Sequence, residues 1–101
     1  MLIPKGCTLT NTFTFPFLKE DVSALYITYS QNGKEVVEKN LNDCEFVDNR
    51  IHVLLSQEET LRFDENLRIS VQIRVRLNDG TVTKSEIIRA YADPILKEGV
   101  I

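Results

Sequence analysis

The stretch LRISVQIRVRL (residues 67–77) alternates apolar and polar residues along its whole length. Successive side chains of a β-strand point to opposite faces of a sheet, so this pattern predicts a strand with one apolar face. Five residues are expected to face the core: Leu67, Ile69, Val71, Ile73 and Val75. A slip of one residue would instead bury the arginines at 68, 74 and 76, so the register is strongly specified.

The same alternation occurs towards the N-terminus. Residues 8–15 read TLTNTFTF, with Leu9, Phe13 and Phe15 on one face and threonines on the other, which predicts a half-buried strand. Pro16 lacks a backbone donor, so this strand is expected to end there or to lie at a sheet edge. Residues 24–30, ALYITYS, alternate again and predict a second strand.

Turn residues separate the remaining strand-like segments. Asn32-Gly33 predicts a hairpin between residues 24–30 and 34–39, because both residues tolerate a positive φ. A second hairpin is expected around Asn49, between residues 44–48 and 50–55. Asn78-Asp79-Gly80 predicts the turn into a return strand at residues 81–91.

The segment Ser56-Gln57-Glu58-Glu59 has the spacing of a helix capping box, in which the serine and a glutamate bond each other's backbone. We expect a short helix over residues 57–62, with Leu61 turned inward, ended by Asp64-Glu65-Asn66. The chain thus contains seven predicted strands, with one helical turn between the fifth and the sixth.

This spacing predicts an all-β fold, an antiparallel sandwich of two sheets, with a small closed barrel as the alternative. We expect the 101 residues to form one domain, with an N-terminal arm at residues 1–7 and a C-terminal tail at residues 92–101. The tail is short and partly apolar, so we expect it to dock on the body or on a neighbour.

Composition limits the partners. The net charge of −3 argues against nucleic acid, because phosphate binding normally requires a basic excess. No apolar run is long enough for a transmembrane helix, and no secretory signal peptide is expected at the N-terminus. The two cysteines, Cys7 and Cys44, are too few for a disulfide framework and indicate free thiols in a reducing cytoplasm. A bridge between them is the alternative.

No motif of catalysis, metal binding or nucleotide binding occurs in the chain. His52, the single histidine, is expected on an outward strand position without a cysteine or carboxylate at ligand spacing. Cys7 lacks a setting that would activate its thiol. We therefore expect a protein that is not an enzyme and takes no cofactor or metal.

Six residues are candidates for an interface. An outward stripe in the strand at residues 67–77 consists of Arg68, Gln72, Arg74 and Arg76. It is either a solvated face paired with acidic neighbours such as Glu86, or a protein contact, in which arginine is enriched. Tyr26 and Leu54 are expected on the face of their strands that points away from the buried side chains. There they either lie under loops or help to form an apolar patch.

Several segments together resemble a known group of proteins. They are Ile3-Pro4-Lys5-Gly6, the threonine-rich strand, YITYSQNGK (residues 26–34), LLSQEET (residues 54–60) and VQIR (residues 71–74), followed by SEI (residues 85–87). These segments are similar to those of short structural proteins of prophages and tailed phages, and to the N-terminal immunoglobulin-like domain of the phage baseplate upper protein.

The resemblance implies an immunoglobulin-like sandwich and a structural role in the phage tail or baseplate. It implies contacts with copies of itself or with other tail proteins, and a place in the virion after synthesis in the bacterial cytoplasm. The chain has no Trp, and its cysteines are not on the second and sixth predicted strands, so "immunoglobulin-like" refers to topology alone. A carbohydrate-binding module and a small regulator of a host protein are the alternative functions.

Overall fold

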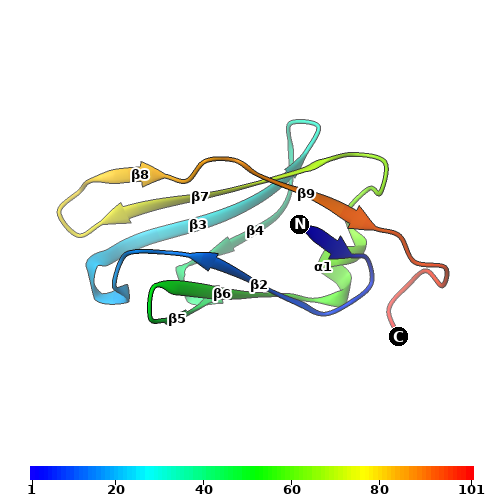
Figure 1. Cartoon of the computed structure of the whole chain (residues 1–101), viewed down its shortest axis with the longest axis horizontal. Helices are drawn as coiled ribbons and strands as arrows, with labels where there is room; N and C mark the ends of the chain where they lie inside the picture. The colour runs from blue at the N-terminus through cyan, green and yellow to red at the C-terminus, as the bar shows by residue number, and fades with distance from the viewer.

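Two β-sheets stack face to face in the computed structural model, which describes residues 1–101 (Figure 1). The larger sheet has the order β1-β9-β7-β3-β4, with β8 also paired to β7, and the smaller has the order β2-β6-β5. The larger sheet is formed by β1 (Leu2–Pro4), β3 (Val22–Gln31), β4 (Lys34–Asn40), β7 (Ile69–Leu77), β8 (Val82–Lys84) and β9 (Ile88–Asp93). The smaller is formed by β2 (Leu9–Thr14), β5 (Cys44–Val47) and β6 (Arg50–Leu55). The predicted sandwich is confirmed.

Three short helical segments connect the strands: η1 (Lys19–Asp21), η2 (Leu41–Asp43) and α1 (Gln57–Leu61). The predicted capping box of α1 is confirmed, because Ser56 Oγ accepts from the Glu59 N–H at 3.2 Å and Glu59 Oε1 accepts from the Ser56 N–H at 2.9 Å. None of these helical segments could span a lipid bilayer.

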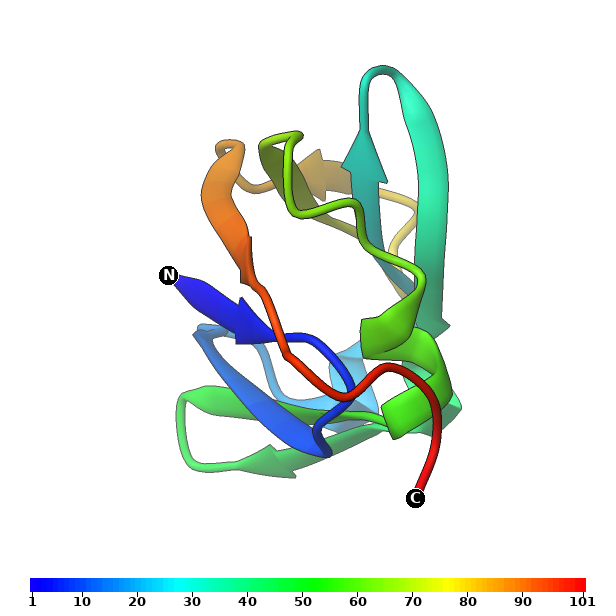
Figure 2. The same cartoon turned by 90° about the vertical axis from the view of Figure 1, so that its right-hand side faces the viewer.

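The number of strands is nine, where the sequence pattern predicts seven. The first additional strand is β1, which belongs to the predicted N-terminal arm and pairs parallel with β9 (Figure 2). The Tyr91 N–H donates to Met1 O at 3.0 Å and the Lys5 N–H to Asp93 O at 3.0 Å, while Ile3 is fully buried. Three residues are too few to show a period, so the pattern cannot indicate this strand.

The second difference is a break in the predicted strand at residues 81–91, which the structure divides into β8 and β9. At the break, the Ser85 N–H donates to Ile73 O at 2.8 Å, and Ser85 Oγ accepts from the Ile73 N–H at 3.0 Å. The serine hydroxyl thus replaces a backbone carbonyl of the ladder. The regular pairing with β7 ends at Lys84, the bonds of Ser85 follow it, and regular pairing resumes at Ile88.

The start of β7 also differs from the prediction. The strand begins at Ile69, so Arg68 precedes it and Leu67, which was expected in the core, is 39% exposed. The cause is the buried side chain of Gln31. Its Nε2 donates to Asp64 O at 2.7 Å and to Leu67 O at 2.8 Å, and its Oε1 accepts from the Asp64 N–H at 2.9 Å. These bonds hold residues 64–67 as a loop.

The core lies between the sheets and consists of 19 buried apolar residues. It contains the inward side chains that alternation predicts on β3, β6 and within β7, together with Phe13 and Phe15, and also Phe63 from the loop after α1. Leu9, which was expected in the core as well, is only partly buried. Buried polar groups are bonded: Tyr29 Oη donates to Asn11 Oδ1 at 3.2 Å, joining β3 to β2 across the core. Both cysteines are free thiols, Cys7 exposed and Cys44 buried.

Two hairpins have the positive φ that their turns require. Asn32 has φ 52° and Gly33 φ 75°, as Asn-Gly predicts. In the hairpin between β5 and β6 the positive φ, 53°, belongs to Asp48. The C-terminal tail lies against α1, where Gln57 Nε2 donates to Ile101 O at 3.3 Å and the Ile101 N–H donates to Gln57 Oε1 at 3.1 Å.

Candidate protein-interaction surface

Four of the six candidate residues lie together on the outer face of the larger sheet. Tyr26 on β3 is directly opposite Arg74 on β7, with Gln72 and Arg76 at alternate positions of the same strand. Arg76 is paired with Ala24, and Gln72 with Thr28. Directly opposite residues of an antiparallel pair share one face of the sheet, so these four side chains form one surface.

Leu54 and Arg68 lie elsewhere. Leu54 is 54% exposed on β6 of the smaller sheet, between the buried Val53 and Leu55. Since the outer faces of a sandwich point in opposite directions, Leu54 and Tyr26 do not form the joint apolar patch considered from the sequence. Arg68 is exposed in the loop before β7 and does not continue the stripe as a strand residue.

The structure adds three residues to this surface, which the sequence analysis missed. Lys84 on β8 is paired with Arg74, Val82 with Arg76, and Arg89 on β9 with Ser70 of β7. The position of these three residues on the outer face depends on the break at Ser85, which no local sequence signal predicts. We call this surface the basic face; it consists of Tyr26, Gln72, Arg74, Arg76, Val82, Lys84 and Arg89.

The cations of the basic face form no ion pair, although Glu35 and Glu38 of β4 lie on the same outer face, opposite Ser30 and Thr28 of β3. The structure contains two ion pairs, Lys5–Glu65 and Lys39–Glu59, and neither involves this surface. The alternative in which Glu86 pairs with the arginine stripe is therefore wrong: Glu86 lies in the break between β8 and β9, and the cross-strand neighbours of Arg74 are Tyr26 and Lys84.

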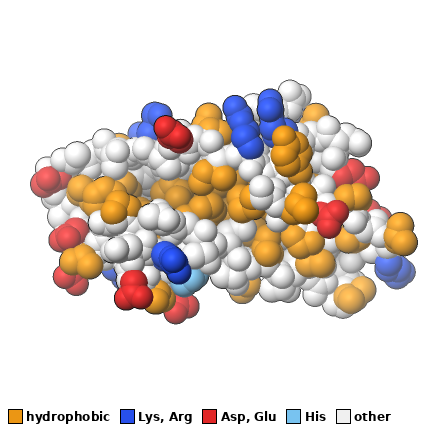
Figure 3. Space-filling model, viewed as in Figure 1, with side chains coloured by type: hydrophobic (Ala, Val, Ile, Leu, Met, Phe, Trp, Pro, Cys, Tyr) orange, Lys and Arg blue, Asp and Glu red, His pale blue; other side chains and the backbone are white.

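Neutral hydroxyl groups bond two of these guanidinium groups. Arg76 Nε donates to Ser23 Oγ at 3.0 Å, and Arg89 Nη1 donates to Ser70 Oγ at 3.0 Å. The remaining donors of each guanidinium are available to an anionic group, which arginine binds well through parallel hydrogen bonds. In the space-filling view, basic side chains lie along the upper layer, while an apolar band runs between the layers (Figure 3).

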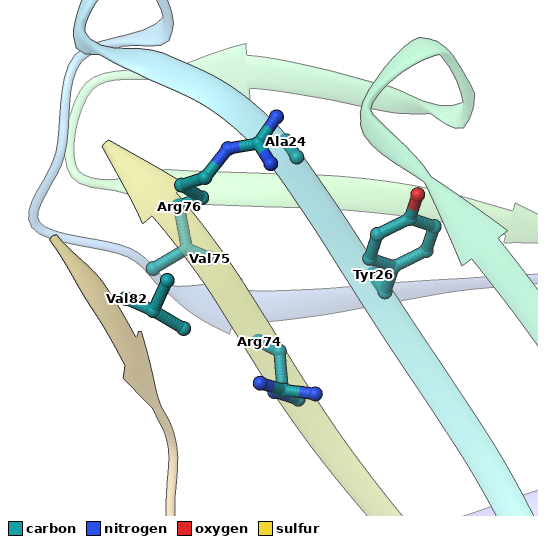
Figure 4. A pocket seen from close by; sticks show the side chains of 6 residues that line it. All are labelled: Ala24, Tyr26, Arg74, Val75, Arg76 and Val82. Carbon is teal, nitrogen blue, oxygen red and sulfur yellow. The ribbon is translucent and has the colours of Figure 1, made fainter. Parts of the chain in front are cut away.

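A shallow hollow lies within the basic face (Figure 4). Its volume is about 160 Å³, and its lining consists of Ala24, Tyr26, Arg74, Val75, Arg76 and Val82. Sites that enclose a small-molecule ligand usually have volumes of about 300–1,000 Å³. The hollow is therefore large enough for one side chain of another protein. Its floor is apolar, and two arginines lie beside it.

The groups capable of chemistry are dispersed. His52 Nδ1 lies 2.8 Å from Thr12 Oγ1 on the outer face of the smaller sheet. Burial raises the pKa of Cys44 to about 11, and the nearby Asp43 carboxylate raises it as well, so this residue is a thiol at neutral pH. No group of three or more His, Cys, Asp and Glu side chains could hold a metal ion.

One ion pair makes stability depend on pH. Burial raises the pKa of Glu59, but hydrogen bonds from Lys39 Nζ at 2.7 Å and from the Ser56 N–H at 2.9 Å lower it more, so the pKa is below its usual value. A carboxyl group with a lowered pKa stabilises the fold above its unfolded-state pKa of about 4.3, and this contribution is lost as the pH falls.

We therefore expect the free energy of unfolding to decrease from about pH 5 to about pH 3, and to decrease less steeply in Glu59→Gln. Urea unfolding of both proteins across this range measures the difference. Exposed Glu58, which is adjacent on α1, provides the matched control Glu58→Gln. Equal slopes for wild type and Glu59→Gln would show that the Lys39–Glu59 pair does not contribute.

Comparisons with known proteins agree with this architecture. No protein-family model and no curated protein matches the sequence. Solved structures do match, among them strand-swapped dimers of the immunoglobulin-like domain and of the extracellular domain of mouse leukocyte-associated immunoglobulin-like receptor 1. The first has a TM-score of 0.51 at 12% identity, covering 93% of this chain and 88% of that chain. The second has a TM-score of 0.50 at 10% identity, covering 92% and 86%. At this identity the likeness shows the fold alone: the chain is an immunoglobulin-like β-sandwich.

Proposed function

We propose that the protein is a non-enzymatic assembly module that acts through protein–protein contacts, with the basic face as its contact surface. The observation that carries the proposal is the group of cations without an ion pair beside the exposed ring of Tyr26. Arginine and tyrosine are enriched in protein interfaces and among the residues that contribute most to binding. The partner surface is acidic, since it complements this charge.

The setting that we propose is a phage tail or baseplate, where the protein joins other tail proteins, copies of itself, or both. The resemblance of its segments to those of phage structural proteins supports this setting. Association between copies is supported by the two similar structures, which are both strand-swapped dimers. The protein would then be made in the bacterial cytoplasm and incorporated in the virion.

The proposal is tested with immobilised wild-type chain and two charge-reversed variants. Arg74→Glu changes the basic face, and Arg50→Glu makes the same change on the smaller sheet, where Arg50 is exposed. Each chain is presented with dissociated tail proteins from phage particles of the bacterium that carries the gene, and retained proteins are identified by mass spectrometry.

We expect the wild type and Arg50→Glu to retain a tail protein, and Arg74→Glu to bind it at least about tenfold more weakly. Binding by the wild type should weaken as the salt concentration rises, because both charged surfaces are exposed. Retention of no tail protein by the wild type would contradict the setting. Equal binding by Arg74→Glu and Arg50→Glu would contradict the proposed surface.

A further inference from the structure

β2 forms an open edge of the smaller sheet. It pairs with β6 alone, and the Phe15 N–H donates to Asn49 O at 2.7 Å just beyond the last paired residue. Alternate residues of an antiparallel strand bond to the same neighbour, so the odd-numbered residues of β2 bond to β6. The backbone N–H and C=O groups of Thr10, Thr12 and Thr14 therefore point away from the sheet.

Nothing within the chain occupies this edge. No backbone hydrogen bond outside the strand ladders involves Thr10, Thr12 or Thr14, and their side chains are exposed. In Figure 1, β2 lies on the near side of the lower layer, with no strand of that layer in front of it. An unpaired edge of this kind is a template for a further strand.

The other open edges are protected against pairing. β1 and β8 have three residues each, and β5 has four, including Glu45. The long edge strand β4 carries four charged side chains of both signs, at Lys34, Glu35, Glu38 and Lys39. By contrast, β2 has six residues, LTNTFT, without a charge, a proline or a shift in its register. Charged side chains, prolines and bulges are the usual means by which proteins block edge strands.

The residue pattern of β2 is complementary to itself. If two copies meet antiparallel about a two-fold axis at Thr12, that residue is opposite its counterpart, and Thr10 is opposite Thr14 of the second copy. The three bonded pairs exchange about six backbone hydrogen bonds, and threonine pairs are favourable across strands. On the inner face Asn11 is opposite Phe13 of the second copy, so no like charges meet.

We propose that a second copy of the chain binds along the β2 edge, so that the smaller sheets of two copies join into one continuous sheet β5-β6-β2-β2-β6-β5. This inference rests on the proposed function, which includes association between copies of the chain, and it names the surface through which the copies associate. The basic face lies on the other sheet and remains free in such a dimer. Its binding to a tail protein is measured separately, so the two proposals fail independently.

The test uses opposite charges at the proposed axis. Thr12→Lys and Thr12→Glu each place two like charges opposite one another in the dimer, whereas a mixture of the two variants places Lys opposite Glu. Leu54→Lys is the control, because Leu54 is exposed on the face of the same sheet but not on the edge strand. Light scattering on a sizing column at micromolar concentration measures the molar mass of each sample.

We expect wild type and Leu54→Lys to have twice the chain mass of 11.6 kDa. Each Thr12 variant alone should dissociate at least about tenfold more readily, and the mixture should recover the dimer. Recovery also shows that both variants are folded. A monomeric wild type, a dimer that neither Thr12 variant weakens, or a mixture that stays monomeric would overturn the inference. If Leu54→Lys dissociates as readily as the Thr12 variants, the contact lies on the sheet face, and this result would overturn the inference as well.

Discussion

Phe63→Ala is expected to lower the free energy of unfolding by about 3–5 kcal/mol, which is the usual cost of removing a buried phenylalanine. Phe63 is 1% exposed, and its ring centroid lies 6.1 Å from that of Tyr29. Truncation leaves a cavity beside Tyr29, which is itself fully buried and bonded to Asn11. A domain of this size has a total stability of about 5–15 kcal/mol, so the loss is a large fraction.

Urea unfolding followed by fluorescence or circular dichroism measures this loss. Phe17→Ala is the matched control: Phe17 is half-buried and contacts Phe15 edge-on, with ring centroids 5.4 Å apart. We expect it to cost less than Phe63→Ala, because part of its surface is in water in the folded state. A loss below about 1 kcal/mol for Phe63→Ala would show that the loop after α1 is not part of the core.

Gln31→Ala is expected to lower the free energy of unfolding by about 2–4 kcal/mol, because it removes three hydrogen bonds. The Asp64 N–H and Leu67 O lose their partner, whereas Asp64 O keeps its bond from the Leu67 N–H at 3.3 Å. The side chain is 5% exposed, so water can replace these bonds only if the loop opens. The expected result includes faster amide exchange at Asp64, whose N–H donates to Gln31 Oε1 at 2.9 Å.

The control is Gln72→Ala, which removes the same type of side chain from the basic face. Gln72 makes one bond, from Nε2 to Ser85 O at 3.2 Å, and is half-buried, so we expect a cost below about 1 kcal/mol. Urea unfolding of the two variants gives the comparison. Similar losses for Gln31→Ala and Gln72→Ala would contradict the role of Gln31 in holding the 64–67 loop.

The paired strands that build most of the core were predictable, because alternation with a period of two is a local property of the sequence. The same alternation misplaced Leu67, since it carries no information about Gln31, a residue distant in sequence that bonds the backbone at 64–67. Phe63 was not recognised as core because it follows a helix and belongs to no periodic run. The short strand β1 depends on its pairing with β9, which is a tertiary contact.

The candidate surface was predictable only in part, for a similar reason. Alternation placed Gln72, Arg74 and Arg76 on one face of β7, and it placed Tyr26 outward on β3. It could not show which strands are neighbours, so the contributions of Lys84 and Arg89 were missed. It also could not assign Leu54 to the opposite sheet. The pairing of strands, rather than their existence, decides what the surface contains.

Our central proposal is that this protein is a structural component that acts through protein contacts. The most direct test is to measure how much of the protein is present in purified phage particles. Particles released by the bacterium that carries the gene are purified on a density gradient, and the chain is quantified by mass spectrometry against the tail proteins. Our account predicts that the chain is present in a fixed ratio to a tail protein in every preparation. A chain found only in the lysate, and absent from the particles, would contradict it.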